Sequence, residues 1–329
     1  MKPAAFAISL LALTCSTFTN GQSTPVSVLT VDVDGTGYSF DETDRSRVAR
    51  DINVSPATPT ANFNEFVTLF DVVEVNGKRA KGVLVSSGII LMLRPDPAPG
   101  QAIADVMRGS FYHSYLELLQ EDGTPVGTLT TDGFFGGPAP PGSPRIATAA
   151  NQTITGGTGA FLGARGQVTV TTRPTRPMLR TPTEASVRED PSRRRVHPPS
   201  RADRLLITLI PLNAPEIRAV YHADFSPVSA ASPARPGEVL IAAATGLGPT
   251  RPGVDPGAPF PAAPLDLVNS PVEVTAGGKS ADVANKVGWP GTRDTYRVDF
   301  RLPADVSGDI SIQVTAAWIT GPEFRIPVR

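Results

Sequence analysis

The stretch Ile154-Thr-Gly-Gly-Thr-Gly-Ala-Phe-Leu-Gly-Ala-Arg-Gly-Gln-Val168 places two groups of glycines on either side of Phe161, directly before a segment of alternating residues. The first group, from Gly156 to Gly159, predicts a turn with positive φ, because glycine adopts that conformation at no steric cost. The second group, from Gly163 to Gly166, predicts bends or close approaches of the backbone within a β-structure. Phe161 is expected to be buried, and Val168-Thr-Val-Thr-Thr172 has the alternation of a strand.

This glycine-rich stretch does not match a nucleotide-binding loop. A phosphate-binding loop carries Lys and then Ser or Thr directly after its last glycine, and here Ala164 and Arg165 follow Gly163. A strand comes next, so no helix N-terminus follows to receive an anion. The chain also has no His-x-x-x-His pair and no Gly-x-Ser-x-Gly elbow, and its 3 histidines are scattered singly. The sequence therefore predicts no cofactor and no metal site.

The composition predicts an all-β protein. The chain has 329 residues, which is enough for about two domains. Its 34 prolines and 30 glycines are typical of many short strands joined by turns. The formal net charge of -1 argues against nucleic acid as a partner.

The N-terminus has the features of a signal peptide, covering residues 1–21. Met1-Lys-Pro-Ala-Ala-Phe-Ala-Ile-Ser-Leu-Leu-Ala-Leu-Thr14 carries a positive charge and then an apolar run that is too short to span a bilayer. Cys15 is the only cysteine, so cleavage after Gly21 leaves none for a disulfide, a thiol nucleophile or a thiolate metal site. The alternative is a lipoprotein anchored through Cys15, which the preceding Ala12-Leu-Thr14 fits poorly. We therefore expect a secreted or periplasmic protein without a transmembrane segment.

Alternating segments predict the strands of a first domain over residues 22–212. They cover residues 26–33, 63–75, 81–85, 89–93, 104–120, 125–130, 168–172 and 205–210. Asn76-Gly77 and Asp122-Gly123 predict the tight turns of hairpins. Asp32-Val-Asp-Gly-Thr-Gly37 predicts another turn rather than a calcium loop, because Thr43 stands at the twelfth position, where a calcium loop needs glutamate.

Residues 173–203 interrupt this pattern with repeated prolines and the basic block Arg193-Arg-Arg195. They predict a disordered insertion just before the last strand of the first domain. Two interpretations stay open for the basic block: a solvated insertion, or a binding site for an anionic polymer or membrane headgroups.

The pattern changes again over residues 213–329, which predict a second domain. Short alternating segments separated by Pro and Gly turns cover residues 239–244, 272–275, 281–283, 296–302, 310–314 and 324–328. Short strands at this spacing predict an immunoglobulin-like β-sandwich. The expected fold class is thus all-β, an antiparallel β-barrel followed by an immunoglobulin-like sandwich.

Two resemblances to known families fit these predictions. Residues 81–170, ending in Gly156-Gly-Thr-Gly-Ala-Phe-Leu-Gly-Ala-Arg-Gly166, resemble the barrel shared by plant dirigent proteins and allene oxide cyclases, in which such a turn and an Ala-Arg-Gly strand close the barrel. That resemblance implies an apolar small molecule as ligand and an oligomer, commonly a trimer, formed through the barrel. Residues 234–329, including Ala244-Thr-Gly-Leu-Gly-Pro-Thr250, resemble a β-sandwich domain of unknown function at the C-terminus of secreted bacterial proteins.

The first resemblance carries Arg165, the arginine of Ala-Arg-Gly, over to this chain as a candidate lumen contact. Alternation adds Arg108 and Tyr112, which lie on one face of a predicted strand, whereas His113 and Glu117 lie on the other. Only one of these faces can line a lumen. The candidate contacts of a ligand are therefore Arg165, Tyr112 and Arg108.

Three functions follow from the sequence. The first is an exported, non-catalytic binding or structural protein, because the chain offers no recognisable nucleophile, metal cluster or paired histidine. The second is a dirigent-like or cyclase-like barrel enzyme that folds an apolar small molecule. The third is adhesion to a surface polymer such as a polysaccharide through the second domain, with Trp289 and Trp318 as stacking platforms. Trp318 lies in an apolar strand pattern and is expected in the core, whereas Trp289 lies on a predicted turn.

Overall fold

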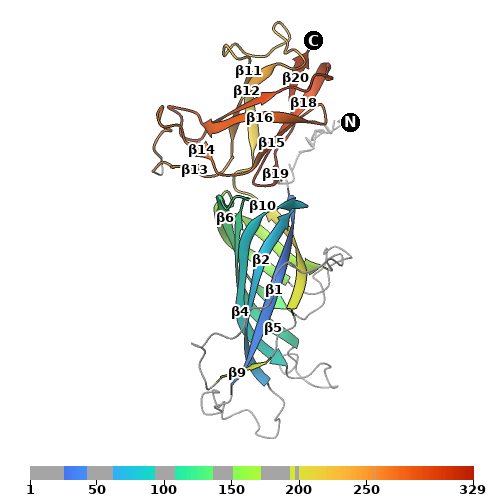
Figure 1. Ribbon diagram of the computed structural model, residues 1–329, viewed down its shortest axis with the longest axis vertical. Coiled ribbons are helices and arrows are strands. Elements are labelled where there is room, and N and C mark those ends of the chain that lie inside the picture. Colours follow the sequence, from blue (N-terminus) through green and yellow to red (C-terminus); the bar gives the residue numbers. More distant parts are fainter. Residues whose placement is uncertain are drawn as a thin grey trace, which may run out of the picture.

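The computed structural model describes residues 26–42, 62–92, 108–135, 151–171, 193–196, 200–255 and 257–329. This part of the chain is all-β, as the composition predicts, and contains no helix. Its strands form two ten-stranded sheets that follow one another along the sequence and lie end to end (Figure 1). No helix in the described residues is long and apolar enough to cross a membrane.

The first sheet closes into an antiparallel barrel. Eight strands make the closed ring, because β1 pairs with both β2 and β10. In order around the barrel they are β1 (Ser27–Glu42), β2 (Asn62–Val75), β4 (Lys81–Met92), β5 (Arg108–Leu119), β6 (Pro125–Phe135), β7 (Asn151–Gly159), β8 (Arg165–Thr171) and β10 (Ser200–Ile210). The short β3 (Lys78–Arg79) extends the hairpin from β2, and β9 (Arg193–Val196) pairs with the end of β1.

Tight turns join the strands at one end of the barrel. Asn76 and Gly77 both have positive φ, 51° and 76°, which confirms the predicted hairpin. Asp122-Gly123 also forms a turn, with φ of 90° at the glycine. Phe161 is buried between β7 and β8, as predicted.

The glycines before Phe161 differ from the prediction. Gly159 does have positive φ, but Gly156 and Gly157 lie within β7 and do not. A Cβ at Gly157 would lie 2.4 Å from the Phe161 carbonyl oxygen and 2.7 Å from that of Thr128. Its role is therefore close packing of backbones rather than a turn.

A further prediction in the first domain is wrong. The turn expected at Asp32–Gly37 does not exist, because β1 runs through it and Gly35 packs against the β2 backbone, where a Cβ would lie 2.1 Å from the Leu69 carbonyl oxygen. Of the insertion predicted over residues 173–203, the structure describes β9, built from the basic block, and the first residues of β10. Cross-strand pairing with β1 orders both segments. The predicted signal peptide with Cys15 lies outside the described residues, as do most of the other insertion residues.

The inside of the barrel is apolar toward the tight turns. Residues on the inward faces of all eight strands are buried there; they include Leu29, Val31, Val72, Leu84, Leu116, Leu118, Leu129, Ile154, Val168, Ile207 and Leu209. Farther from the turns the inward positions become polar, with Ser86, Ser114, Thr131 and Gln152 buried on neighbouring strands.

The second sheet curls around its own core. Its strands are β11 (Glu216–Tyr221), β12 (Val239–Thr245), β13 (Thr250–Arg251), β14 (Leu267–Val268), β15 (Val272–Ala276), β16 (Lys279–Gly288), β17 (Tyr296–Arg301), β18 (Gly308–Ala316), β19 (Ile319–Thr320) and β20 (Phe324–Val328). The start of β16 pairs with β15 and the rest of it with β17, so this strand carries the sheet from one layer to the other. Leu240, Val298, Phe300 and Ile312 are among the side chains buried between the layers.

The hairpin between β18 and β19 inserts into the first core rather than the second. Its tip, Ala317 and Trp318, has φ of 49° and 62° and packs within the buried cluster of the barrel. Trp318 is 9% exposed, so it is a core residue as predicted, but it belongs to a turn and to the core of the other sheet. Lys78 also pairs with Glu273, and the Gln120 amide donates to the Asn269 carbonyl oxygen. The second sheet therefore sits on the tight-turn end of the barrel (Figure 1).

Candidate functional site

The structure separates the residues predicted to line a lumen. Tyr112 is half-buried on the same side of β5 as the buried Ser114 and Leu116, so it faces inward, and His113 faces outward, beside Asp132. Arg108 begins β5 in the same alternation as Tyr112, although its side chain lies outside the described part.

Arg165 does not join Tyr112. It is exposed at the start of β8, on the outer side of the barrel, and its guanidinium donates to the Ala164 carbonyl oxygen at 2.8 Å. The inward neighbours on this strand are Gly166 and Val168, which pair with the inward Leu209 and Ile207. Arg165 therefore ties down the glycine-rich turn and does not contribute to a lumen.

A hydrogen-bonded polar belt crosses the barrel interior on β4, β5, β6 and β7. The hydroxyls of Ser86 and Ser114 lie 2.7 Å apart, and the Gln152 amide donates to Ser114 Oγ at 3.2 Å. Thr131 Oγ1 donates to Gln152 Oε1 at 2.9 Å. Each of these buried groups has a partner within the belt, so the belt satisfies its own polar atoms and specifies the strand register.

An aromatic cluster lies on the outer face of the second sheet. Trp289, just after β16, makes edge-to-face contacts with Tyr221 at the end of β11 and with Phe225, both at 6.1 Å between ring centroids. The outward-facing Ile241 and Val287 on this side of the sheet are buried as well. We call Tyr221, Phe225 and Trp289 the aromatic face. Trp289 is half-buried within it, whereas 52% of Phe225 remains exposed.

The turn that carries Phe225 holds it in a costly conformation. Phe225 has φ of 65°, in the left-handed region that bulky residues rarely adopt. Its N–H donates to the His222 carbonyl oxygen at 3.0 Å, and the His222 N–H donates to the Ser226 carbonyl oxygen at 2.9 Å. Asp224 Oδ1 accepts from the N–H and the hydroxyl of Ser226, at 2.9 and 2.6 Å. These bonds hold the backbone of the turn, and with it the left-handed conformation of Phe225.

A guanidinium lies beside the exposed ring. Arg297 on β17 has its central carbon 5.4 Å from the centroid of Phe225, within the range of a cation–π contact. Asp299 holds this arginine through two bonds, from Nε at 2.7 Å and from Nη2 at 2.9 Å. The pair keeps the guanidinium in one orientation and leaves Nη1 pointing away from the carboxylate.

Three polar groups of this surface have no partner among the described residues. They are the hydroxyl of Tyr221, the indole N–H of Trp289 and Nη1 of Arg297. None of the three is among the polar atoms of the described chain that are both buried and unpartnered, so each is open to solvent or to a ligand. The surface therefore offers ring faces and unused hydrogen-bond donors side by side.

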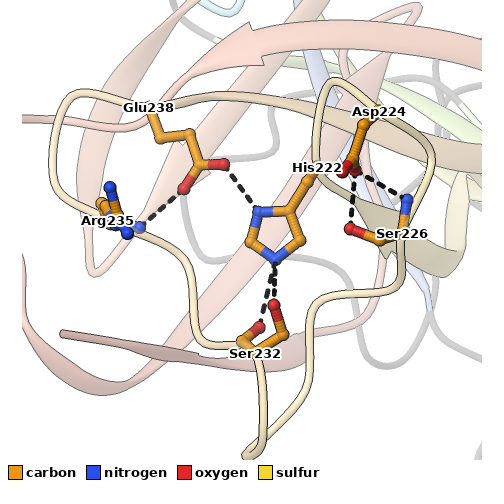
Figure 2. A network of polar contacts seen from close by, with 6 residues as sticks. All are labelled: His222, Asp224, Ser226, Ser232, Arg235 and Glu238. Atoms are coloured by element: carbon orange, nitrogen blue, oxygen red, sulfur yellow. Dashed lines mark hydrogen bonds and ion pairs between the residues drawn. The ribbon is translucent and has the colours of Figure 1, made fainter.

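A histidine clasp fastens the Phe225 turn to the neighbouring loop (Figure 2). His222 Nδ1 lies 2.6 Å from Glu238 Oε1, and Nε2 lies 3.1 Å from the Ser232 carbonyl oxygen and 3.2 Å from Ser232 Oγ. The other oxygen of Glu238 accepts from the Arg235 N–H at 2.8 Å. The hydrogen bond to Glu238 is the main cause that raises the pKa of His222, and the Ser232 carbonyl adds to it.

The clasp has the connectivity of a Ser–His–acid relay, but its contacts favour the protonated form of the histidine. A relay needs a neutral imidazole that takes the hydroxyl proton of serine. Here both ring nitrogens face acceptors and the pKa of His222 is raised, which favours the protonated ring over the neutral one that a relay uses. The N–H of Ser232 is also engaged, since it donates to the Ser229 carbonyl oxygen at 3.0 Å. The arrangement links the Phe225 turn to the loop that carries Ser232 and Glu238.

Sequence reasoning identified Trp289 as a candidate platform and missed its partners. Tyr221 and Phe225 come from a segment that precedes Trp289 by more than sixty positions, and the pairing of β11, β12, β17 and β16 brings them together. His222 and Glu238 are likewise joined by a loop whose path the sequence does not give. No group of three or more His, Cys, Asp or Glu in the described residues is placed to hold a metal ion.

Comparisons with known proteins add little to this geometry. No protein-family model and no curated protein sequence matches the chain. A solved structure described as a polysaccharide lyase is similar at a TM-score of 0.18 and 10% sequence identity, over 90% of this chain and 40% of that chain. The present chain thus spans less than half the length of that lyase, and a similarity at this level does not establish a shared fold or family.

Proposed function

We propose that this is a non-catalytic binding protein that attaches to polysaccharide outside the cell through the aromatic face. The observation that carries the proposal is the exposed ring of Phe225, fixed in a left-handed conformation beside Trp289 and under Arg297. The predicted signal peptide supports the location. The curled second sheet then serves as an immunoglobulin-like module that presents the ring, and the barrel serves as its base.

The backbone strain at Phe225 argues for a use of its side chain. A left-handed conformation costs a residue with a Cβ roughly 1–2 kcal/mol, and glycine avoids that cost. The neighbouring side chains gain little from Phe225, because half of the ring is in solvent. Strain of this kind clusters at functional sites, and here it falls on an exposed side chain rather than on a buried one such as Trp318.

The chemistry of the aromatic face matches a sugar. A pyranose has a C–H face that packs on an aromatic ring and a rim of hydroxyls that bond to N–H and O–H groups. The aromatic face supplies both, with a ring in solvent and three unused donors around it. A protein partner would need about 800 Å² of complementary surface on each side. One exposed ring surrounded by polar groups is large enough to bind a single sugar residue. A polysaccharide repeats such a residue along its chain.

The test is depletion of the purified mature protein from solution by insoluble cellulose, chitin, mannan and starch. We expect at least one polymer to retain the wild type, and Phe225→Ala to weaken that retention by roughly tenfold or more, as for an anchor residue of an interface. Tyr115→Ala is the matched control, since Tyr115 is an aromatic residue of the barrel wall that is 42% exposed. It should bind like the wild type.

Equal retention of the wild type and Phe225→Ala on every polymer would exclude the aromatic face as the binding site. A wild type that none of the polymers retains, but that forms an aromatic-face-dependent complex with a protein, would replace polysaccharide by a protein ligand.

A second candidate function rests on the barrel interior. Tyr112 faces inward between Gly88 and Gly133 on the two neighbouring strands, so the inward positions around it are small. In this function the protein would be an oligomer of dirigent-like barrels, and each barrel would hold an apolar small molecule beside Tyr112. Native mass spectrometry of the protein from its own host tests it: a co-purifying molecule that Tyr112→Ala removes supports this function, and a ligand-free mass opposes it.

A further inference from the structure

The charges around Phe225 are the starting point for naming the class of polysaccharide. Asp224 directly precedes Phe225 and is fully exposed. Its Oδ1 receives both bonds from Ser226, which lower the pKa of the carboxyl, so it is ionised at neutral pH. Its Oδ2 has no hydrogen-bond donor among the described residues.

The other charges near the aromatic face are balanced. Arg297 is neutralised by the two bonds to Asp299, and His222 by Glu238. Arg235 lies beyond Glu238, on the side of His222 away from Asp224 (Figure 2). On the turn after Trp289, Arg293 is followed directly by Asp294, so this turn carries no net charge. Asp224 forms no ion pair among the described residues, and the cation that acts on it, His222, is already paired with Glu238, so these three groups keep a net negative charge on the turn that carries Phe225.

We infer that the aromatic face selects neutral polysaccharides over polyuronates, and that Asp224 is the residue that sets this preference. The inference rests on the proposed function and names its ligand class. A sugar hydroxyl both donates and accepts, so one hydroxyl can give its proton to Asp224 Oδ2 while another accepts from Nη1 of Arg297. A uronate carboxylate only accepts, so it gains no bond from Asp224 and meets a like charge.

The alternative of an acidic ligand held by Arg297 is weaker on the same observations. The guanidinium already makes a two-point contact with Asp299 through Nε and Nη2, so its charge is offset by that carboxylate. A uronate carboxylate would have to bind at the remaining Nη1/Nη2 edge, where Asp299 already offsets the charge of the arginine. Discrimination here comes from an unfavourable contact with the wrong ligand as well as a favourable one with the right ligand.

The experiment is affinity electrophoresis in gels that contain either neutral hydroxyethyl cellulose, glucomannan and xyloglucan or the polyuronates polygalacturonate and alginate. Asp224→Asn is the informative variant, because asparagine keeps an Oδ1 acceptor for Ser226 and removes the charge. Asp282→Asn, an exposed carboxylate on β16 at the end away from Trp289, is the matched control. Phe225→Ala reports whether binding uses the aromatic face.

We expect a neutral polymer to retard the wild type at least fivefold more strongly than any polyuronate at low salt. Asp224→Asn should raise polyuronate binding severalfold, whereas Asp282→Asn should not. Salt should raise polyuronate binding by the wild type, because it screens the repulsion. Equal retardation by both polymer classes, unchanged in Asp224→Asn, would overturn the inference and leave the proposed function intact. A folded wild type that no polymer retards would instead overturn the proposed function itself.

Discussion

Phe225 is the residue on which the proposed binding site depends most. Its backbone adopts an unfavourable left-handed conformation although its ring remains exposed. Glycine at this position should relieve the left-handed strain that alanine keeps. We therefore expect Phe225→Gly to be more stable than Phe225→Ala by about 1 kcal/mol, the left-handed cost less the greater flexibility of unfolded glycine. Urea unfolding of the two variants measures this difference, and both should lose polysaccharide binding equally.

The opposite order of stability, with Phe225→Ala the more stable, would mean that the left-handed φ of 65° does not strain the turn. The functional use of the ring would then lose its main support.

His222 makes the Phe225 turn sensitive to pH. The pKa of this histidine is raised above 6.5 in the folded protein, first by Glu238, so its contribution to stability is complete below pH 6.5 and is lost as the pH rises through the folded pKa. We expect the urea midpoint of the wild type to fall on going from pH 6 to pH 9 by more than that of His222→Gln. Identical pH profiles would show that the clasp does not stabilise the protonated ring.

At the scale of the strands, the sequence predicted features that depend on neighbouring residues, such as hairpin turns. It did not predict features that depend on contacts between distant strands. Asn76-Gly77 predicted its hairpin because only a few dipeptides suit two successive residues with positive φ. The six short segments predicted after residue 213 all appear as strands. Gly35 and Gly157 were misassigned to turns, because a glycine needed for close approach of two strands has the same local sequence signal as a turn glycine.

The polar belt of the barrel is a feature of four strands together. Ser114→Ala removes one acceptor and leaves the Gln152 amide and the Ser86 hydroxyl without a buried partner. We expect it to lower the free energy of unfolding by about 1–3 kcal/mol. In the Ser114→Ala background, Ser86→Ala should lower the free energy of unfolding by less than it does in the wild type. The reason is that the two hydroxyls share one hydrogen bond.

A double-mutant cycle read by chemical denaturation tests this coupling. Additive effects of the two substitutions would mean that the belt is not a connected network. The polar belt could not be predicted from the sequence. Alternation shows which residues share a face of one strand, but it does not show how neighbouring strands are staggered around the barrel.

At the scale of the whole molecule, Trp318 joins two sheets that the sequence presents as separate domains. Its ring belongs to the second sheet by connectivity and to the barrel core by packing. We expect Trp318→Ala to destabilise the barrel by about 3–5 kcal/mol, as for other buried tryptophans. Hydrogen exchange of the β1 and β2 amides should accelerate in this variant. Exchange that accelerates only in the second sheet would contradict the assignment of Trp318 to the barrel core.

Only part of the candidate site could be predicted, because it too combines residues from distant parts of the sequence. Trp289 was recognisable as an aromatic residue on a turn, but its neighbours Tyr221, Phe225 and Arg297 come together through strand order and register, which depend on the whole sheet. The reverse holds for Arg165, which the resemblance of a local motif suggested as a lumen contact and which the structure places exposed at the start of β8.

The central claim is that the aromatic face binds a neutral polysaccharide, and the fluorescence of Trp289 tests it most directly. Trp318→Phe leaves Trp289 as the sole tryptophan, since the chain has only 2. Titration of this variant with soluble glucomannan, xyloglucan and hydroxyethyl cellulose should give a saturable blue shift of emission for at least one polymer, and Phe225→Ala in the same background should abolish it. Emission that stays unchanged in the folded protein at saturating concentrations of all three would contradict the account.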